Sequence, residues 1–202
     1  MREDEGMDAA QSSLAPRAHL ELLEELSADE HPHSGRTLLE HLSGTRDLMA
    51  AWGNAPEVCA AGLFHSIYGT AYYRIQSASL DRRGDVAAVI GSRAEELAFL
   101  FCVTDRTGFL EQASSAEPVL HDRVHEAAIR VTPDTIDALI EIEMANCVEQ
   151  IDPAQARPGT ADWLEQMRDR ARGHCSAGAE AALAGLVGRC RAVESGSEVS
   201  SS

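Results

Sequence analysis

The core-facing positions of the segment 38–52 recur every three or four residues, and this spacing restricts the fold more than any other feature of the chain. They are Leu38, Leu42, Thr45, Met49 and Trp52. Positions spaced in this way share one face of an α-helix, and the Gly53 that follows predicts the end of that helix. The same period runs through most of the chain, which predicts an all-α fold of about seven or eight helices without a convincing strand.

Residues with known preferences at helix starts mark further helices. Pro56 is placed to open one helix and Pro133 another. Ser92 and Glu95 have the spacing of a capping box, in which the two residues bond to each other's backbone. The segment near 107–131 lacks a clear period and is expected to be irregular.

The length of 202 residues suits one domain. We expect it to span residues 16–192, between a flexible N-terminus at 1–15 and a flexible C-terminal tail at 193–202, because both ends are polar. No apolar run approaches the roughly 18 residues of a membrane span, and the acidic N-terminus does not resemble a signal peptide. The sequence therefore predicts a cytoplasmic protein, whose five widely spaced cysteines are expected to be free buried thiols.

The charge composition excludes several classes of function. The chain carries 33 acidic and 17 basic residues, a net charge of −16, whereas surfaces that bind nucleic acids or membranes need clustered positive charge. Every basic residue is an arginine. Without lysine, a Schiff-base enzyme, a pyridoxal phosphate site and a Walker A loop are excluded. An acidic chain can still bind a phosphate locally through a few arginines.

Two histidines lie where neighbouring helices can bring them together. His41 is on the inner side of the helix over 38–52, and His65 ends the next helix after a run of small apolar residues. Neutral imidazole is a common ligand of transition metals, so the two rings can converge on one ion. The alternative is two semi-buried histidines bonded to backbone carbonyls. His121 and His125, four residues apart, are a second candidate for a chelating pair.

These histidines belong to a longer pattern. His41, Gly53 and His65 are each twelve residues apart, and "AAGLFHS" stands where one family has "AALLHD". "VIGSRAEELAFLFCVTDR" looks like that family's "FGxEVAxLVxGVTK" helix, and "EIEMANCVEQ" resembles the helix that supplies its last metal ligand. The segment 36–105 thus resembles the HD-domain superfamily of helical phosphohydrolases and oxygenases, most closely the (p)ppGpp-hydrolase type. The resemblance implies a single HD-like helical domain, in a divergent branch with HS in place of HD.

The resemblance also implies a metal site and shows where this chain departs from it. His41 and His65 match two ligands of the family, while Ser66 and Asn146 stand where it has aspartates. Glu143 shares a helix face with Asn146 and would restore a carboxylate to the two histidines. The implied cofactor is one divalent transition metal, Fe, Zn, Mn or Ni, with His41, His65, Glu143 and Asn146 as its candidate ligands.

Other polar residues are candidates for substrate binding, because the resemblance implies that the segment after the second histidine lines a cavity. Tyr68 is placed to donate to a substrate oxygen and Tyr72 to contact the substrate. Arg36 and Arg106 are candidates to clamp a carboxylate or phosphate, and His33 to close over the mouth of the site. The candidate catalytic residues are His65, Ser66, Tyr68 and Asn146.

Three functions remain open. The first is an HD-type enzyme for a small-molecule substrate, by metal-dependent hydrolysis or oxygenation or with His65 as a general base. Hydrolysis of (p)ppGpp itself is not expected, because Gly69 and Thr70 replace the family's Glu-Asp pair. The second is a catalytically silent HD scaffold that binds a metabolite or a protein partner. The third is a structural protein in which His41 and His65 do not converge. An oligomer is compatible with each.

Overall fold

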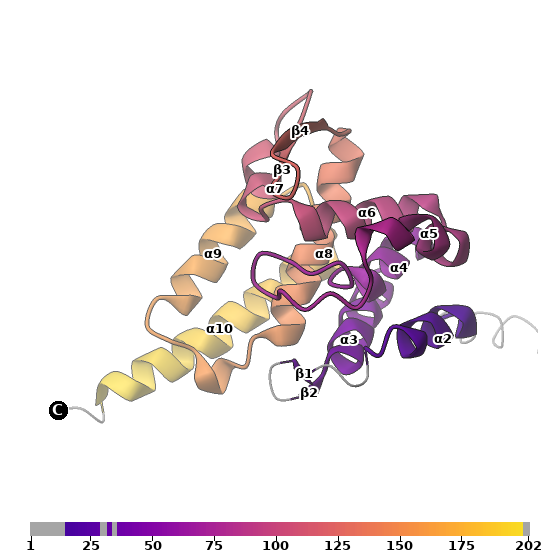
Figure 1. The fold of residues 1–202 in the computed structure, drawn as a ribbon. Helices are drawn as coiled ribbons and strands as arrows, with labels where there is room; N and C mark the ends of the chain where they lie inside the picture. The colour runs from indigo at the N-terminus through magenta and orange to yellow at the C-terminus, as the bar shows by residue number, and fades with distance from the viewer. Residues whose placement is uncertain (1–14, 29–31, 34–35, 200–202) are drawn as a thin grey trace, which may run out of the picture. The chain divides into compact units, whose positions relative to one another are not determined.

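The computed structural model describes residues 15–28, 32–33 and 36–199. Within these ranges the chain forms nine α-helices and two short antiparallel strand pairs (Figure 1). The all-α class is confirmed. The count exceeds seven or eight because α5 (Arg83–Ile90) and α7 (Thr107–Gln112) are too short to show a period. None of the helices in the described ranges is both long and apolar enough to cross a membrane.

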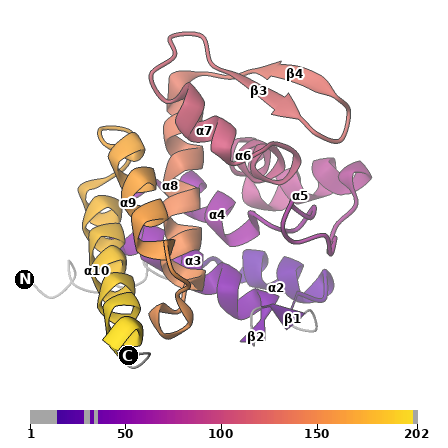
Figure 2. The ribbon, with the colours of Figure 1, turned by 90° about the vertical axis from the view of Figure 1, so that its left-hand side faces the viewer.

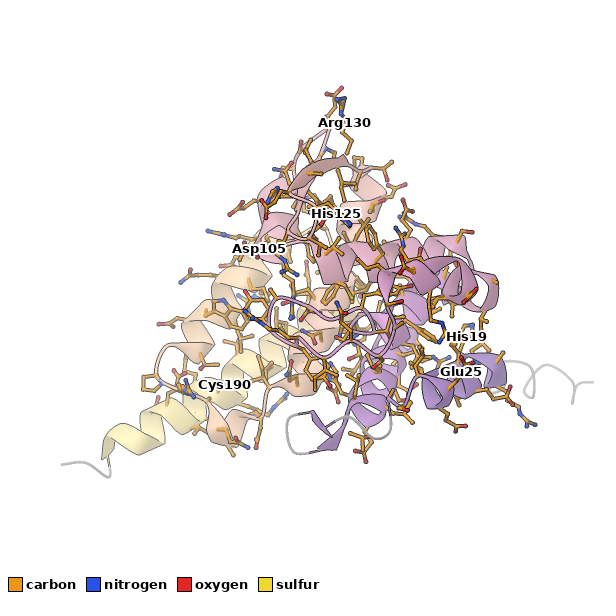
Figure 3. All side chains as sticks on the ribbon, viewed as in Figure 1. His19, Glu25, Asp105, His125, Arg130 and Cys190 are labelled. Atoms are coloured by element: carbon orange, nitrogen blue, oxygen red, sulfur yellow. The ribbon has the colours of Figure 1, made fainter. Side chains whose placement is uncertain are left out.

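The chain divides into two compact units, Met1–Val103 and Thr104–Ser202. The expectation of one domain over 16–192 stays a prediction. Besides α5, the first unit contains α2 (Arg17–Glu25), β1 (Pro32–His33), β2 (Arg36–Thr37), α3 (Leu38–Ala51), α4 (Pro56–Phe64), the 3-10 turn η1 (Leu80–Arg82) and α6 (Ser92–Val103). Helix α4 packs against α3 and α6, and α5 against α2 and α6. Glu25, labelled in Figure 3, ties α2 to the turn before α5 by accepting a hydrogen bond from Arg82 at 2.8 Å.

Local sequence explains where α3 and α4 begin and end. Thr37 and Glu40 form a reciprocal capping box at the start of α3, with bonds of 3.2 Å from the Glu40 N–H and 2.8 Å to the Glu40 carboxylate. Gly53, just beyond the helix, has φ +83°, a conformation that favours glycine. Pro56 is the first residue of α4. The helix end at Gly53 and the start at Pro56 are confirmed.

The second unit contains, after α7, β3 (Val119–Asp122), β4 (Ala127–Arg130), α8 (Pro133–Gln150), the 3-10 turn η2 (Pro153–Gln155), α9 (Thr160–Ala171) and α10 (Ala177–Val199). Figures 1 and 2 show α9 and α10 lying side by side. The tail expected from residue 193 is helical as far as Val199. The reason is a tertiary contact, because Glu194 accepts a hydrogen bond from the Ala161 N–H at 3.1 Å and joins α10 to the start of α9.

The expectation that the chain lacks strands, and that the segment near 107–131 is irregular, is wrong. Strands β3 and β4 form an antiparallel hairpin in register from Val119–Arg130 to Asp122–Ala127 (Figure 2). Its turn has no glycine, which hides it in the sequence. The Asp122 carboxylate closes the turn by accepting from the N–H groups of Val124 and His125 at 2.8 and 3.1 Å. Strands β1 and β2 pair in the same antiparallel sense.

Candidate functional site

Helices α3 and α4 bring His41 and His65 face to face in the first unit. The helices approach closely because Gly62 of α4 has no side chain, since a Cβ there would collide with the sulfur of Met49 on α3. His41 lies on the buried face of α3, and α4 ends at His65. The two histidines are 0% and 1% exposed. The rings therefore converge, as the spacing of the sequence predicts.

The hydrogen bonds of the pair give it a direction. Nε2 of His41 and Nε2 of His65 are 3.2 Å apart, and the two rings are inclined at 79°. Nδ1 of His65 lies 2.7 Å from the carbonyl oxygen of Gly62. Because a carbonyl oxygen only accepts, Nδ1 of His65 carries a proton. In the neutral ring Nε2 of His65 then has a lone pair, which accepts the hydrogen bond from Nε2–H of His41.

The surroundings of the pair hold both rings in place. The edge of the His65 ring packs against Phe101 of α6, with ring centres 5.1 Å apart. The thiol of the next residue, Cys102, donates to the backbone carbonyl of His65 at 3.1 Å. On α3 the Thr45 hydroxyl donates to the backbone carbonyl of His41 at 3.0 Å. Cys102 is a free thiol, as expected, and so are the other four cysteines.

Ser66, which stands in place of the family's aspartate, is only 4% exposed. Its backbone carbonyl accepts from the Gly69 N–H at 3.0 Å. Its hydroxyl, by contrast, has no hydrogen-bond partner among the residues that the structure describes. A buried hydroxyl without a partner is unfavourable, so this group is available to a ligand or a water.

The hydroxyl of Tyr68 is bonded to a buried ion pair. It donates to Glu95 of α6 at 3.0 Å, and Arg83 of α5 donates to the same carboxylate through Nε and Nη2 at 2.6 and 2.8 Å. Burial, together with the charge of Glu95, raises the pKa of Tyr68 well above its usual range, so the phenol keeps its proton. The expected capping role of Glu95 gives way to this network, because Arg83 is twelve residues earlier and no local pattern announces it.

The remaining residues proposed for substrate binding in the first unit differ in what surrounds them. Tyr72 is 71% exposed. It belongs to a turn in which Thr70 Oγ1 accepts from the N–H groups of Tyr72 and Tyr73 at 3.2 and 2.9 Å. The backbones of His33 and Arg36 face each other in the β1–β2 pair. Their side chains lie outside the described part of the structure.

Three candidate residues meet in the second unit. Arg106 Nη1 donates to Glu143 at 3.0 Å, and Asn146 Nδ2 donates to the same carboxylate oxygen at 3.2 Å. Burial raises the pKa of Glu143, against the opposite effect of Arg106. The shared face of Glu143 and Asn146 on α8 is as expected, whereas the ion pair with Arg106 is not visible in the sequence. Their roles as metal ligands, catalytic group and substrate clamp stay predictions.

His121 and His125 do not share a helix face, because they lie on the β3–β4 hairpin. Nδ1 of His125, labelled in Figure 3, is 2.7 Å from Asp122, while His121 faces Glu126 at 3.3 Å. The two rings are thus bonded to different carboxylates. The chelating pair suggested by their four-residue spacing is a correction that follows from the strand structure.

The His41–His65 pair fits two positions of a metal site. Its spacing of 3.2 Å suits two nitrogens that each lie about 2.1 Å from one ion. The bond from Nδ1 of His65 to a carbonyl is also typical of metal-binding histidines. Within the described ranges, however, no three His, Cys, Asp or Glu side chains form a group that can hold an ion. These residues supply two ligands and not a complete metal centre.

Comparison with known proteins agrees with this fold. Residues 22–106 match a family described as a domain of unknown function (DUF6817). No curated protein matches the chain. A solved structure with a similar fold is that of a metazoan ortholog of SpoT that hydrolyzes ppGpp and plays a role in starvation responses. The TM-score is 0.58 at 14% identity, over 89% of this chain and 98% of that one. At this identity the likeness shows the fold alone, and it confirms an HD-like helical fold.

Proposed function

We propose that this protein is a divergent HD-type enzyme that acts on a small-molecule substrate, with His41 and His65 at the centre of its site. One observation carries the proposal. The Gly62 carbonyl orients His65 so that its Nε2 lone pair faces Nε2 of His41 at 3.2 Å. Two core histidines that only satisfied backbone groups would not need to point at each other.

The pair can take up and return a proton. A proton added to it is held between two ring nitrogens, and imidazole titrates near neutral pH, as a general base requires. The unpartnered hydroxyl of Ser66, the next residue, can bind a substrate oxygen. Consecutive residues of a helical turn point about 100° apart, so we assign Ser66 to binding and not to nucleophilic attack through His65.

The cofactor we propose for the pair is a divalent transition metal, Fe, Zn, Mn or Ni. His41 and His65 would hold it through their Nε2 atoms, and when bound it would supply a Lewis acid that activates a water. The described residues provide no third side chain of the usual ligand types next to the two rings. For that reason the proton chemistry of the pair is proposed independently of the ion.

The substrate we propose is not (p)ppGpp. Gly69 and Thr70, which replace the family's acidic pair, belong to a turn: Gly69 has φ +75°, and Thr70 is engaged with backbone N–H groups. Neither residue offers a carboxylate. Hydrolysis of another small molecule is favoured as the reaction class, because the protein of similar fold is a hydrolase.

A second candidate function is a catalytically silent scaffold that binds a metabolite or a protein partner. The observation that favours it is the burial of both histidines, at 0% and 1% exposure. A substrate reaches their nitrogens only after the structure around them opens. The loss of both family carboxylates, at Ser66 and Asn146, points the same way.

The experiment that tests the proposal is elemental analysis of the untagged protein, with a parallel screen for hydrolysis of small phosphate and ester substrates. The variants are His41→Ala and His65→Ala. The matched control is His121→Ala, which removes a histidine that is exposed and bonded to Glu126. We expect metal and turnover in the wild type and the control, and their loss in both site variants.

Other results separate the alternatives. Turnover without metal, abolished in His65→Ala, would leave the acid–base enzyme and remove the metal. Neither metal after reconstitution nor turnover, with a metabolite retained by the wild type, would replace the enzyme by the silent scaffold. Metal or turnover that survives in both site variants would place the chemistry elsewhere and overturn the proposal.

A further inference from the structure

A cleft opens in the first unit where the first turns of α5 and α6 lie next to each other. Its volume is about 570 Å³, within the range of small-molecule sites, and neither His41 nor His65 lines it. Gly84 makes room on the α5 side, because a Cβ at that position would meet no atom within 4 Å. Arg83 and Arg93 are both among its lining residues.

The guanidinium of Arg83 is held firmly at the edge of this cleft. Nε and Nη2 donate to Glu95 at 2.6 and 2.8 Å, and the guanidinium carbon lies 3.5 Å from the centre of the Phe99 ring. Arginine has further N–H donors on its outer edge. They have no acceptor among the described residues. A group fixed in this way presents its free donors without losing much conformational freedom on binding.

Arg93 supplies a second positive charge to the same cleft. Its Nη1 donates to Glu96 at 2.9 Å, in a pair whose side chains are 38% and 54% exposed. Exposed pairs three residues apart are weak and exchange readily with other partners. An incoming anion can therefore displace Glu96, which also lines the cleft, from Arg93. The Arg83–Glu95 bond stays, because Glu95 is buried.

We propose that this cleft binds the oxyanion group of a small molecule, a phosphate or a carboxylate, between Arg83 and Arg93. Guanidinium groups match both kinds of oxyanion by paired hydrogen bonds. Ser92, which also lines the cleft, adds a hydroxyl donor. Since the chain as a whole carries a charge of −16, it repels anions at long range, and affinity has to come from these short-range contacts.

The oxyanion site does not depend on the proposed enzyme function. It shares no residue with the histidine pair, and it binds whether or not His41 and His65 carry out chemistry. Tyr68 and Glu95 connect the two regions, since Tyr68 lies three residues after His65 and donates to the carboxylate that holds Arg83. For this reason the variants below leave Arg83, Glu95 and Tyr68 unchanged.

The test is a titration of the full chain followed by NMR of its backbone amides. Inorganic phosphate is added in one series and acetate in another, each against sodium chloride at the same ionic strength. Two variants alter the cleft: Gly84→Gln fills it and Arg93→Gln removes one charge. The control is Arg17→Gln, which removes an exposed arginine of α2 paired with Glu21.

We expect saturable shifts at the amides of residues 83–96 in the wild type and in Arg17→Gln. Affinity should fall at least about tenfold in Arg93→Gln, the factor that one charge-assisted hydrogen bond commonly supplies, and binding should be lost in Gly84→Gln. Saturation by phosphate alone identifies a phosphate ligand, and by acetate alone a carboxylate.

Shifts that do not saturate with either anion, or that persist unchanged in both cleft variants, would overturn the proposal. An equal loss in Arg17→Gln would do the same, because it would reduce the effect to overall charge. His65→Ala is expected to bind as the wild type does, so a failure of this site is distinguishable from a failure of the proposed enzyme.

Discussion

Nδ1 of His65 donates a hydrogen bond to the carbonyl oxygen of Gly62, 2.7 Å away, and this bond determines how the histidine pair is polarised. It turns the lone pair of His65 toward His41 and leaves His41 as the donor between them. The carbonyl that does this belongs to the glycine that allows α4 to approach α3. The same residue thus sets both the spacing of the helices and the direction of the pair.

The first prediction concerns the coupling of the two rings. His41→Leu and His65→Leu each leave one buried nitrogen without its partner, so each should lower the free energy of unfolding by about 1–3 kcal/mol. The double variant leaves neither nitrogen, and its loss should be smaller than the sum of the two single losses. Urea unfolding of the four proteins measures this. Strictly additive losses would show that the bond between the rings contributes nothing.

The second prediction compares two neighbouring glutamates of α6. Glu95→Gln removes the charge that holds Arg83, in a pair with 6% and 36% exposed side chains. Because water reaches Arg83, we expect a loss of about 1–3 kcal/mol and not the full cost of breaking a buried pair.

Glu96→Gln is the matched control, since its pair with Arg93 is exposed. It should change the free energy of unfolding by less than about 0.5 kcal/mol. Thermal and urea unfolding of both variants decide the matter. Equal effects at the two positions would mean that the network of Tyr68, Glu95 and Arg83 has no special part in stability.

The third prediction is a pH dependence at His19, labelled on α2 in Figure 3. Burial lowers the pKa of its ring, although a hydrogen bond with the backbone of Val89 acts in the opposite direction. The unfolded chain therefore binds a proton at His19 more readily than the folded one. The stability that this residue contributes is present above the unfolded pKa of about 6.5 and is lost as the pH falls below it.

In measurable terms, the wild type should lose more stability than His19→Gln when the pH is lowered from neutrality to the mildly acidic range. Urea unfolding at several pH values gives the comparison. His121→Ala, which removes an exposed histidine, should follow the wild type. A pH dependence that is identical in His19→Gln would assign the acid sensitivity to other groups.

The fourth prediction concerns the β3–β4 hairpin. Asp122→Ala removes the acceptor of two backbone N–H groups and of His125 Nδ1. We expect a loss of about 1–3 kcal/mol, in line with a buried carboxylate that accepts several bonds. The amides of Val124 and His125 should exchange faster with solvent. His125→Ala removes only the side-chain bond and should have the smaller effect; unchanged exchange in Asp122→Ala would contradict the role given to this carboxylate.

The sequence predicts those parts of the fold that local patterns control. The helix over 38–52, its end at Gly53 and the start of α4 at Pro56 all depend on residues next to one another in the chain. The convergence of His41 and His65 was also predictable, because a short connection makes α3 and α4 neighbours. In each case the physical cause lies within a few turns of helix.

The sequence does not predict contacts that only the folded chain creates. Glu95 fits a capping pattern, yet its carboxylate is taken by Arg83 and Tyr68. Glu143 looks like a free candidate ligand, yet Arg106 is paired with it. A charged side chain has many partners of opposite sign along a chain this acidic, and only burial selects one of them.

The thiol of Cys102 offers a built-in clock for the opening of the histidine site. It is 1% exposed and donates to the backbone carbonyl of His65, so an alkylating reagent cannot reach it while that bond is intact. The rate at which Cys102 is labelled therefore reports how often the segment that carries His65 loosens in the native protein. A small molecule that enters the site should change that rate long before its identity is known.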